Sequence, residues 1–494
     1  MISARSERTM PNNNFELCKN IERPDLRLGE LGRRDLLYRF GTGLGSLALS
    51  SLLHRDGLLA AADPQIEDPL AVKPSHFEAK AKSCIFLFMS GAPSQMDTFD
   101  PKPKLNELHG KPILRKYGGL EKRIYVGSSF KFAKHGKSGM EISDIFPHLA
   151  TCADDIAVVR GMYSSSESHP TATFFLNTGV GIPGSPSMGA WVVYGLGTEN
   201  QNLPAFVVLP DTRGGIFGGA INWASGYLPS HNQGTLLNSV GDPIVDLLPP
   251  AGVTTEQQKR NIGLLNSFNA SHLEEQPRNP HLLTRMKNYE LAFRMQSAVP
   301  NSLDLTQEPP AIREMYGLDD KVSEPMGRKC LMARRMVERG VRFVQIYCNG
   351  WDNHSNIQER HKTRGLETDK PIAGLLKDLK QRGLLNETLV VWGGEFGRTA
   401  DNTMDFFRSG PGRDHNKDSM VMWFAGAGIN GGTVVGQTDE LGIKGVEDTY
   451  HTNDLHATML NLMGMDHLRL TYYHSGRFKR LTDLGGKLIK EILA

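Results

Sequence analysis

The sequence predicts an α/β fold with a largely parallel central sheet, helices on both faces and loop-rich insertions. Continuous apolar runs at 83–91 (SCIFLFMSG), 341–348 (VRFVQIYC) and 388–394 (TLVVWGG) are typical of strands that are covered on both sides. Helix-like segments precede the last two runs, and repeated helix–strand units favour a parallel sheet. Because ligands bind beyond the carboxyl ends of such strands, we expect the chemistry in the loops that follow these runs.

The remaining elements follow from periodicity and end signals. The segment 142–162 predicts a helix followed by a short strand at Ile156–Val159. A second helix is expected at 326–340, where Gly340 suits the position after the last turn, and its apolar spacing comes from Met332, Ala333, Met336 and Val337.

A third helix is expected to begin at Asp369 as N-cap, with Pro371 in its first turn. Its apolar face would consist of Ile372, Leu375, Leu376 and Leu379. A strand at 419–428 and a closing helix at 453–464 complete the pattern, and HLLTRMKNYELAFRMQ predicts a helix within an otherwise Gly- and Pro-rich stretch.

These elements divide the chain into three parts. Residues 83–487 form a single α/β domain, with insertions at roughly 163–320, and residues 63–82 form a linker rich in proline and charge. Residues 1–62 combine a polar leader with GRRDLLYRF, a Gly- and Ser-rich apolar run and small residues, which is the order of a twin-arginine export signal. The alternative is a surface Arg pair before an amphipathic helix. The apolar run is too short for a stable transmembrane helix.

The charge of the chain argues against nucleic acid as a partner. Lys and Arg total 56 and Asp and Glu total 54, which leaves a net charge of +2 and no basic stripe. The five cysteines include no C-x-x-C pair, so no zinc ribbon is expected, and they are too few for a disulfide framework in so long a chain. An export signal would instead make the twin-arginine machinery a partner and place the protein in the periplasm or cell envelope.

Carboxylates and histidines follow the expected strands. Asp352 and His354 lie in WDNH, Glu395 opens EFGRT, His415 lies in GRDHN, and Asp97 follows the first strand. Carboxylate oxygen and imidazole nitrogen are ligands for zinc and related divalent ions, so these five side chains are candidate metal ligands. Taken singly, each could instead be a capping residue, a surface histidine or one half of an ion pair.

A further arginine lies close to these ligands. Arg398 comes three residues after Glu395 and could grip an oxyanion with two parallel hydrogen bonds. A structural ion pair between these two side chains is the alternative.

Together these motifs resemble a known family. GAPSQMDTFDPKP, GWDNHSN, GEFGRT, GRDHN and DLHATMLNLMG resemble the bacterial family called domain of unknown function 1501, which is similar to sulfatases of the alkaline phosphatase superfamily. The resemblance implies that fold and a metal site. It also implies that SESHPTATFFLNTG is the nucleophile segment, with Thr171 as attacking group and His169 as nucleophile, ligand or base. A helix N-terminus capped by Ser168 or Thr171 is the alternative.

The resemblance leads us to expect an exported metal-dependent hydrolase of phosphate or sulfate esters, acting on a small molecule or a glycan ester. Its cofactor would be zinc, with calcium, manganese or magnesium as alternatives. Ser90 and Phe396 depart from the superfamily pattern, because they stand where an Asp and a His ligand are usual. A non-catalytic exported binding or envelope protein with a partial metal site is therefore the rival expectation. A phosphotransferase or mutase is a weaker one, since export separates it from most phosphorylated metabolites.

Overall fold

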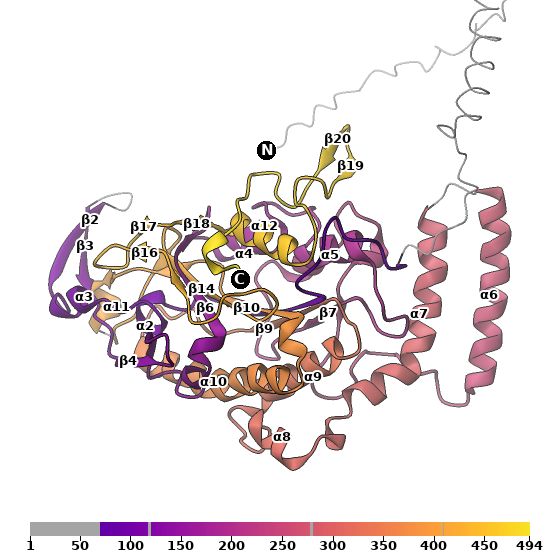
Figure 1. Cartoon of the computed structure of the whole chain (residues 1–494), viewed down its shortest axis with the longest axis horizontal. Coiled ribbons are helices and arrows are strands. Elements are labelled where there is room, and N and C mark those ends of the chain that lie inside the picture. Colours follow the sequence, from indigo (N-terminus) through magenta and orange to yellow (C-terminus); the bar gives the residue numbers. More distant parts are fainter. Residues whose placement is uncertain (1–69, 117–119, 277–279, 409) are drawn as a thin grey trace, which may run out of the picture. The chain divides into compact units, whose positions relative to one another are not determined.

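The computed structural model describes residues 70–116, 120–276, 280–408 and 410–494 (Figure 1). The chain divides into two units, residues 1–67 and 68–494. The expected export signal at 1–62 and the first part of the expected linker, 63–69, lie outside the described residues.

A nine-stranded central sheet organises the described part of the second unit. Its strands run in the order β15-β6-β14-β10-β1-β9-β7-β8, and β18 also pairs with β6. Strand β14 is antiparallel to both of its neighbours, β10 and β6, whereas all the other described pairings in this sheet are parallel. The prediction of a largely parallel sheet is confirmed. The strands are β1 (Ser83–Met89), β6 (Ile156–Tyr163), β7 (Phe206–Leu209), β8 (Thr235–Leu236), β9 (Phe343–Cys348), β10 (Thr388–Gly393), β14 (Met420–Ala425), β15 (Val434–Val435) and β18 (Tyr450–His451).

Helices cover both faces of this sheet (Figure 1). In β1, Ile85, Leu87 and Met89 pack into one core with residues of α9 (Glu324–Val337) and α10 (Ile357–Gln381). Cys84, Phe86 and Phe88 alternate with them and pack into a second core with α5 (Met188–Leu196) and α12 (Thr452–Leu462). Because successive side chains of a strand point to opposite faces, an uninterrupted apolar strand serves two cores at once.

The register of the strands brings their carboxyl ends to one edge. Phe88 of β1 lies opposite Gly393 of β10, and Met89 lies opposite Cys348 of β9. The loops after these three strands therefore begin side by side. Strand β14 starts at this same edge because it runs in the opposite direction, so the loop before it joins the group.

Two predictions of local structure are wrong. Residues 142–155 form the end of β5 (Met140–Ser143) and a 3₁₀ helix (Leu149–Asp155) in place of the expected helix, although the strand that follows is present. Asp369 does not begin a helix, because α10 already starts at Ile357. Its carboxylate instead accepts hydrogen bonds from the backbone N–H groups of His148 and Leu149, both at 2.7 Å, and so caps that 3₁₀ helix from a distant part of the chain.

The stretch 163–320 contributes to the sheet itself as well as to its cover. Strands β7 and β8 extend the parallel sheet beyond β9, and α4 (His169–Thr178) contacts α12. Helices α6 (Thr255–Glu275) and α7 (Pro280–Leu303) pair with each other, and α7 contacts α9. None of the helices in the described ranges is long and apolar enough to cross a membrane.

Short elements complete the described chain. The helices are α2 (Gln95–Thr98), α3 (Pro103–Glu107), α8 (Pro310–Met315) and α11 (Met404–Arg408). The strands are β2 (Pro112–Lys116), β3 (Leu120–Tyr125), β4 (Phe132–His135), β11 (Gly397–Arg398), β12 (Asp401–Thr403), β13 (His415–Asn416), β16 (Gln437–Thr438), β17 (Gly445–Glu447), β19 (Tyr472–His474) and β20 (Arg477–Lys479).

Candidate metal centre

Three imidazole rings converge on the carboxylate of Asp352 at the carboxyl edge of the sheet. Nε2 of His169 lies 3.3 Å from Oδ2 of Asp352. On the other oxygen, Oδ1, Nε2 of His354 lies at 3.0 Å and Nε2 of His415 at 3.4 Å. One ligand atom each from His169, Asp352 and His415 lie within 4.8 Å of one another, a spacing that can hold a metal ion.

The other ring nitrogen of two of these histidines is already bonded. Nδ1 of His169 lies 2.6 Å from Oε1 of Glu395, and Nδ1 of His415 lies 2.8 Å from the backbone oxygen of Glu167. A carboxylate and a carbonyl only accept hydrogen bonds, so each Nδ1 carries the hydrogen. In the neutral rings, both Nε2 atoms then present a lone pair towards Asp352. Metal-binding histidines show this same arrangement, in which an acceptor behind the ring fixes its tautomer.

The Nε2 atom of His169 is the clearest indication that a cation fits this centre. Its Nε2 is buried and makes no well-directed hydrogen bond within the described residues, despite the oxygen of Asp352 at 3.3 Å. A buried polar atom without a partner is costly, whereas a cation would accept its lone pair. The donor set of imidazole nitrogens and a carboxylate therefore fits a divalent ion.

A second group of side chains adjoins the first. His354, Asp414 and His415 also place one ligand atom each within 4.8 Å of one another. Nδ1 of His354 lies 3.5 Å from Oδ1 of Asp414, and Nε2 of His354 lies 3.0 Å from Nε2 of His415. The side chains of His354 and Asp414 are 30% and 31% exposed, whereas that of His169 is 8% exposed, so the centre opens to solvent on the side of His354.

Burial and neighbouring charges shift the pKa values of the side chains in the centre. Burial raises the pKa of Asp352, but the close contacts with His169, His354, His415 and the charge of Arg398 outweigh this effect and hold the pKa far below its usual range. Burial lowers the pKa of His169, but its contacts with Asp352 and Glu395 more than compensate and raise it. A proton and a cation would compete for the same Nε2 lone pair, so metal binding at this centre releases protons.

Gly91 allows the loops after β1, β9 and β10 to meet. Its φ of +102° lies in the left-handed region, and a Cβ atom there would lie 2.4 Å from the backbone nitrogen of Asp352. Its own N–H donates to both oxygens of Glu395, at 2.9 and 3.2 Å, and its carbonyl accepts from Arg398. Gly91 thus contacts the Glu395 carboxylate directly and the Asp352 carboxylate through Arg398.

Arg398 is fully buried and directs its donors to the protein. Its Nη2 donates to Oδ1 of Asp352 at 2.7 Å, and its Nε donates to the carbonyl of Ala92 at 3.0 Å. Its place beside His415 follows from the antiparallel pairing of β11 with β13. These contacts orient the Asp352 carboxylate, whereas the expected grip on a substrate anion stays a prediction.

The structure places the other expected site residues at different distances from the centre. Glu395 contacts the rear of the His169 ring, so its expected role as a direct ligand stays a prediction while its role as a hydrogen-bond acceptor is visible. Asp97 is buried in an ion pair with Arg413, Oδ2 to Nε at 2.7 Å, and also accepts from Ser94 at 2.5 Å. Asp97 belongs to neither of the two described ligand groups.

Thr171 lies two positions after His169 on α4. At about 100° per residue, two positions on a helix point about 200° apart, so these two side chains leave the helix on different sides. Ser168, the N-cap residue, makes no side-chain capping bond. The nucleophile role of Thr171 stays a prediction.

Two partners of the centre, and one partner of Asp97, were not among the expected site residues. Asp414 adjoins His415 in GRDHN but was not among the expected ligands, and the pattern D-H before a strand is the signal that could have found it. The carbonyl of Glu167 acts through the backbone, which carries no sequence signal. Arg413 could have been found only by knowing that a buried Asp97 needs a counter-charge.

Several solved structures resemble this chain in fold at low sequence identity. The lipoteichoic acid synthase LtaP from Listeria monocytogenes is 9% identical with a TM-score of 0.36, covering 81% of this chain and 78% of that one. The alkaline phosphatase from the Antarctic bacterium TAB5 is 11% identical with a TM-score of 0.34, covering 79% and 99%. The PsFucS1 sulfatase from Pseudoalteromonas sp. is 12% identical with a TM-score of 0.35, covering 78% and 68%.

Sequence comparison identifies the family. No curated protein matches the chain. A family model described as "Protein of unknown function (DUF1501)" matches residues 81–493, which is most of the chain and contains all the side chains of the candidate metal centre. The chain therefore belongs to this family, as its motifs led us to expect.

Proposed function

We propose that this protein is an exported, metal-dependent hydrolase of phosphate or sulfate esters. One observation carries the proposal: the Nε2 atoms of His169 and His415 face the Asp352 carboxylate while acceptors behind both rings hold the Nδ1 hydrogens. Imidazole lone pairs that face a carboxylate are repelled by it unless a cation lies between them.

The donor set favours zinc over the alternative ions. Imidazole nitrogen together with carboxylate oxygen suits zinc, whereas calcium and magnesium prefer oxygen ligands alone. His169, Asp352 and His415 would hold the ion, with His354 and Asp414 available for a second one. A bound divalent cation supplies Lewis-acid activation of an ester oxygen and of water.

The residues of the chain would perform the remaining tasks. In hydrolysis, the ester bond to phosphorus or sulfur breaks, water supplies a hydroxyl to the acid product, and its proton goes to the leaving alcohol. Glu395 keeps the His169 ring in the tautomer that exposes Nε2, and Arg398 holds the Asp352 carboxylate. Where no second ion is bound, His354, the most exposed of the three histidines, would carry a proton between substrate and solvent.

Export and substrate class are part of the same proposal. The arginine pair and apolar run before residue 62 support export to the periplasm or cell envelope through the twin-arginine machinery. The opening of the centre at His354 and Asp414 would admit the ester group of a small molecule or of a glycan.

Metal content and turnover test the proposal together. The purified protein, reconstituted with zinc, manganese, magnesium or calcium, is assayed on a panel of chromogenic phosphate and sulfate esters. We expect at least one bound equivalent of zinc, turnover that chelation abolishes, and loss of both in Asp352→Asn. Bound metal without turnover on any ester would favour the rival function, a non-catalytic exported binding protein. A protein that binds no metal would refute the proposal.

A further inference from the structure

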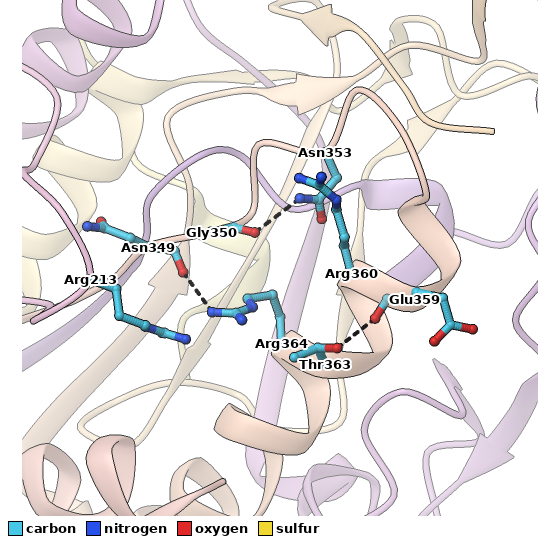
Figure 2. A pocket seen from close by; sticks show the side chains of 8 residues that line it. All are labelled: Arg213, Asn349, Gly350, Asn353, Glu359, Arg360, Thr363 and Arg364. Atoms are coloured by element: carbon cyan, nitrogen blue, oxygen red, sulfur yellow. Dashed lines mark hydrogen bonds between the residues drawn. The ribbon is translucent and has the colours of Figure 1, made fainter. Parts of the chain in front are cut away.

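A cavity of about 310 Å³ lies beside the loop that carries Asp352. Its walls come from the loop after β9, from the first turns of α10 and from Arg213 (Figure 2). A volume of this size is at the lower end of those that hold small ligands. The residues that line it include Arg213, Asn349, Gly350, Asn353, Arg360 and Arg364.

Three arginines give this cavity its chemistry. Figure 2 shows Arg213 and Arg364 pointing towards each other across it, with Arg360 rising beside Asn353. Acidic residues hold the first two in place: Nη1 of Arg213 and Nη1 of Arg364 each lie 2.7 Å from Oε2 of Glu367. Arg213 also pairs with Asp211, with Nη2 and Oδ2 3.1 Å apart, so two carboxylates offset the charges of these two arginines and fix their positions.

Arg360 differs from the other two. Its side chain is exposed and makes no hydrogen bond or ion pair within the described ranges, although it lines the cavity. Among the described residues that line the cavity, Glu359 is the only acidic one, and Figure 2 shows it pointing away from the three arginines. An arginine whose donors are all available, beside two arginines that are already fixed, can donate two parallel hydrogen bonds to a planar or tetrahedral oxyanion.

The cavity and the metal centre share one segment of backbone. Asp352 stands between Gly350 and Asn353, both of which line the cavity, and consecutive Cα atoms are about 3.8 Å apart. Gly350 has a φ of +101°, and a Cβ atom on it would lie 3.0 Å from Nη1 of Arg364. This glycine therefore lets a cavity arginine lie directly against the loop of the metal centre.

We infer that this cavity is a binding site for an anionic oxygen group, namely a phosphate, sulfate or carboxylate, with Arg360 as its donor. The anion could be free in solution, or it could be a second anionic group of the substrate. The second case rests on the proposed function, whereas the first does not.

Calorimetric titration of inorganic sulfate into chelator-treated protein tests the site without metal. Arg360→Gln is compared with the wild type and with Lys362→Gln, which removes the same charge from an exposed position of α10 outside the cavity. We expect sulfate affinity to fall roughly tenfold in Arg360→Gln, the loss typical of one charge-assisted contact, and to stay unchanged in Lys362→Gln. Equal affinities in the two variants would overturn the inference.

Two further measurements separate the sources and the two proposals. Asp352→Asn should bind sulfate as tightly as the wild type does, because the cavity does not need the metal centre. Loss of sulfate binding in Asp352→Asn would place the anion at the metal centre and overturn the inference. The KM of Arg360→Gln is then measured for an ester substrate and for the same ester with an added carboxylate. A rise in KM for the carboxylate-bearing ester alone identifies the anion as part of the substrate. Weaker sulfate binding with both KM values unchanged identifies a free anion.

Discussion

Replacing Glu395 by glutamine tests the tautomer argument on which the metal centre depends. The carboxylate is fully buried, and its Oε1 accepts from Nδ1 of His169 at 2.6 Å and from the backbone of Gly91 at 2.9 Å. Glutamine has the same shape but is neutral, and its NH₂ group cannot accept a hydrogen bond. If the NH₂ group faces Nδ1, the His169 ring must move its hydrogen to Nε2 and lose the lone pair that faces Asp352.

The magnitude follows from the position of Glu395 behind the ring. Acceptors in this position typically contribute 10- to 100-fold to metal affinity, or about 1.4 to 2.7 kcal/mol. We expect zinc affinity to fall by this amount in Glu395→Gln, measured by competition with a chromogenic chelator at pH 7. Burial lowers the pKa of His169, but Glu395 helps to raise it, so proton competition weakens zinc binding more in the wild type than in the variant, and the difference in affinity should grow as the pH rises above 7.

Asp97→Asn is the matched control for this measurement. It also makes a buried carboxylate neutral in the loop after β1, but Asp97 faces Arg413 and not the imidazoles. We expect reduced stability with unchanged zinc affinity. The reasoning is refuted if Glu395→Gln binds zinc as tightly as the wild type. Weaker zinc binding in Asp97→Asn at a temperature where it is folded would restore Asp97 as a ligand.

Other properties of the fold lead to further predictions. Arg413→Met leaves the buried Asp97 carboxylate without its counter-charge, and we expect a loss of about 3 to 5 kcal/mol in the free energy of unfolding, measured with denaturant at pH 7; a loss below about 1 kcal/mol would contradict the ion pair's importance. Burial lowers the pKa of His361 to about 3, so the unfolded chain binds a proton at pH values where the folded protein does not. The free energy of unfolding should therefore fall as the pH drops from about 6.5 to about 3, and His361→Gln should flatten this part of the stability–pH curve. An unchanged curve in His361→Gln would mean that His361 has the same pKa in the folded and unfolded chain. Gly91→Ala should lower the melting temperature and the zinc content together, because the new Cβ atom would lie 2.4 Å from the backbone nitrogen of Asp352. Gly184 is the control: it has a similar φ of +104° but no atom within 4 Å of a Cβ, so Gly184→Ala should cost only the backbone strain of about 1 to 2 kcal/mol.

Much of the fold could be predicted because its signals are local. The apolar runs of β1, β9 and β10 are continuous, and their burial on both faces is visible in the sequence as the absence of alternation. Gly340, expected after the last turn of α9, has a φ of +82°. The helix expected at 142–155 failed for the opposite reason, since its apolar residues face the core from a strand and a 3₁₀ helix that Asp369, far along the chain, caps.

The candidate site shows the same division. Loops after parallel strands meet at one edge, so the proximity of Asp352, His354 and His415 could be expected from their positions after or before buried strands. The direction of each side chain could not. Arg398 orients Asp352, because the pairing of β11 with β13 buries its guanidinium among backbone carbonyls, and this contact could not be read from the sequence, whereas the expected grip of Arg398 on a substrate anion stays a prediction.

By itself, the sequence determined the α/β class, the edge of the sheet at which the candidate centre lies and the residue types gathered there, since periodicity and composition are properties of neighbouring positions. Only the tertiary structure decided which nitrogen of each histidine faces inward, that Glu395 stands behind His169, and that three arginines line a cavity beside the Asp352 loop. These features depend on atoms from segments up to a few hundred residues apart, such as the 226 positions between His169 and Glu395. The hydrogen bonds that select a tautomer or orient a carboxylate arise only when folding brings such segments within about 3 Å of each other.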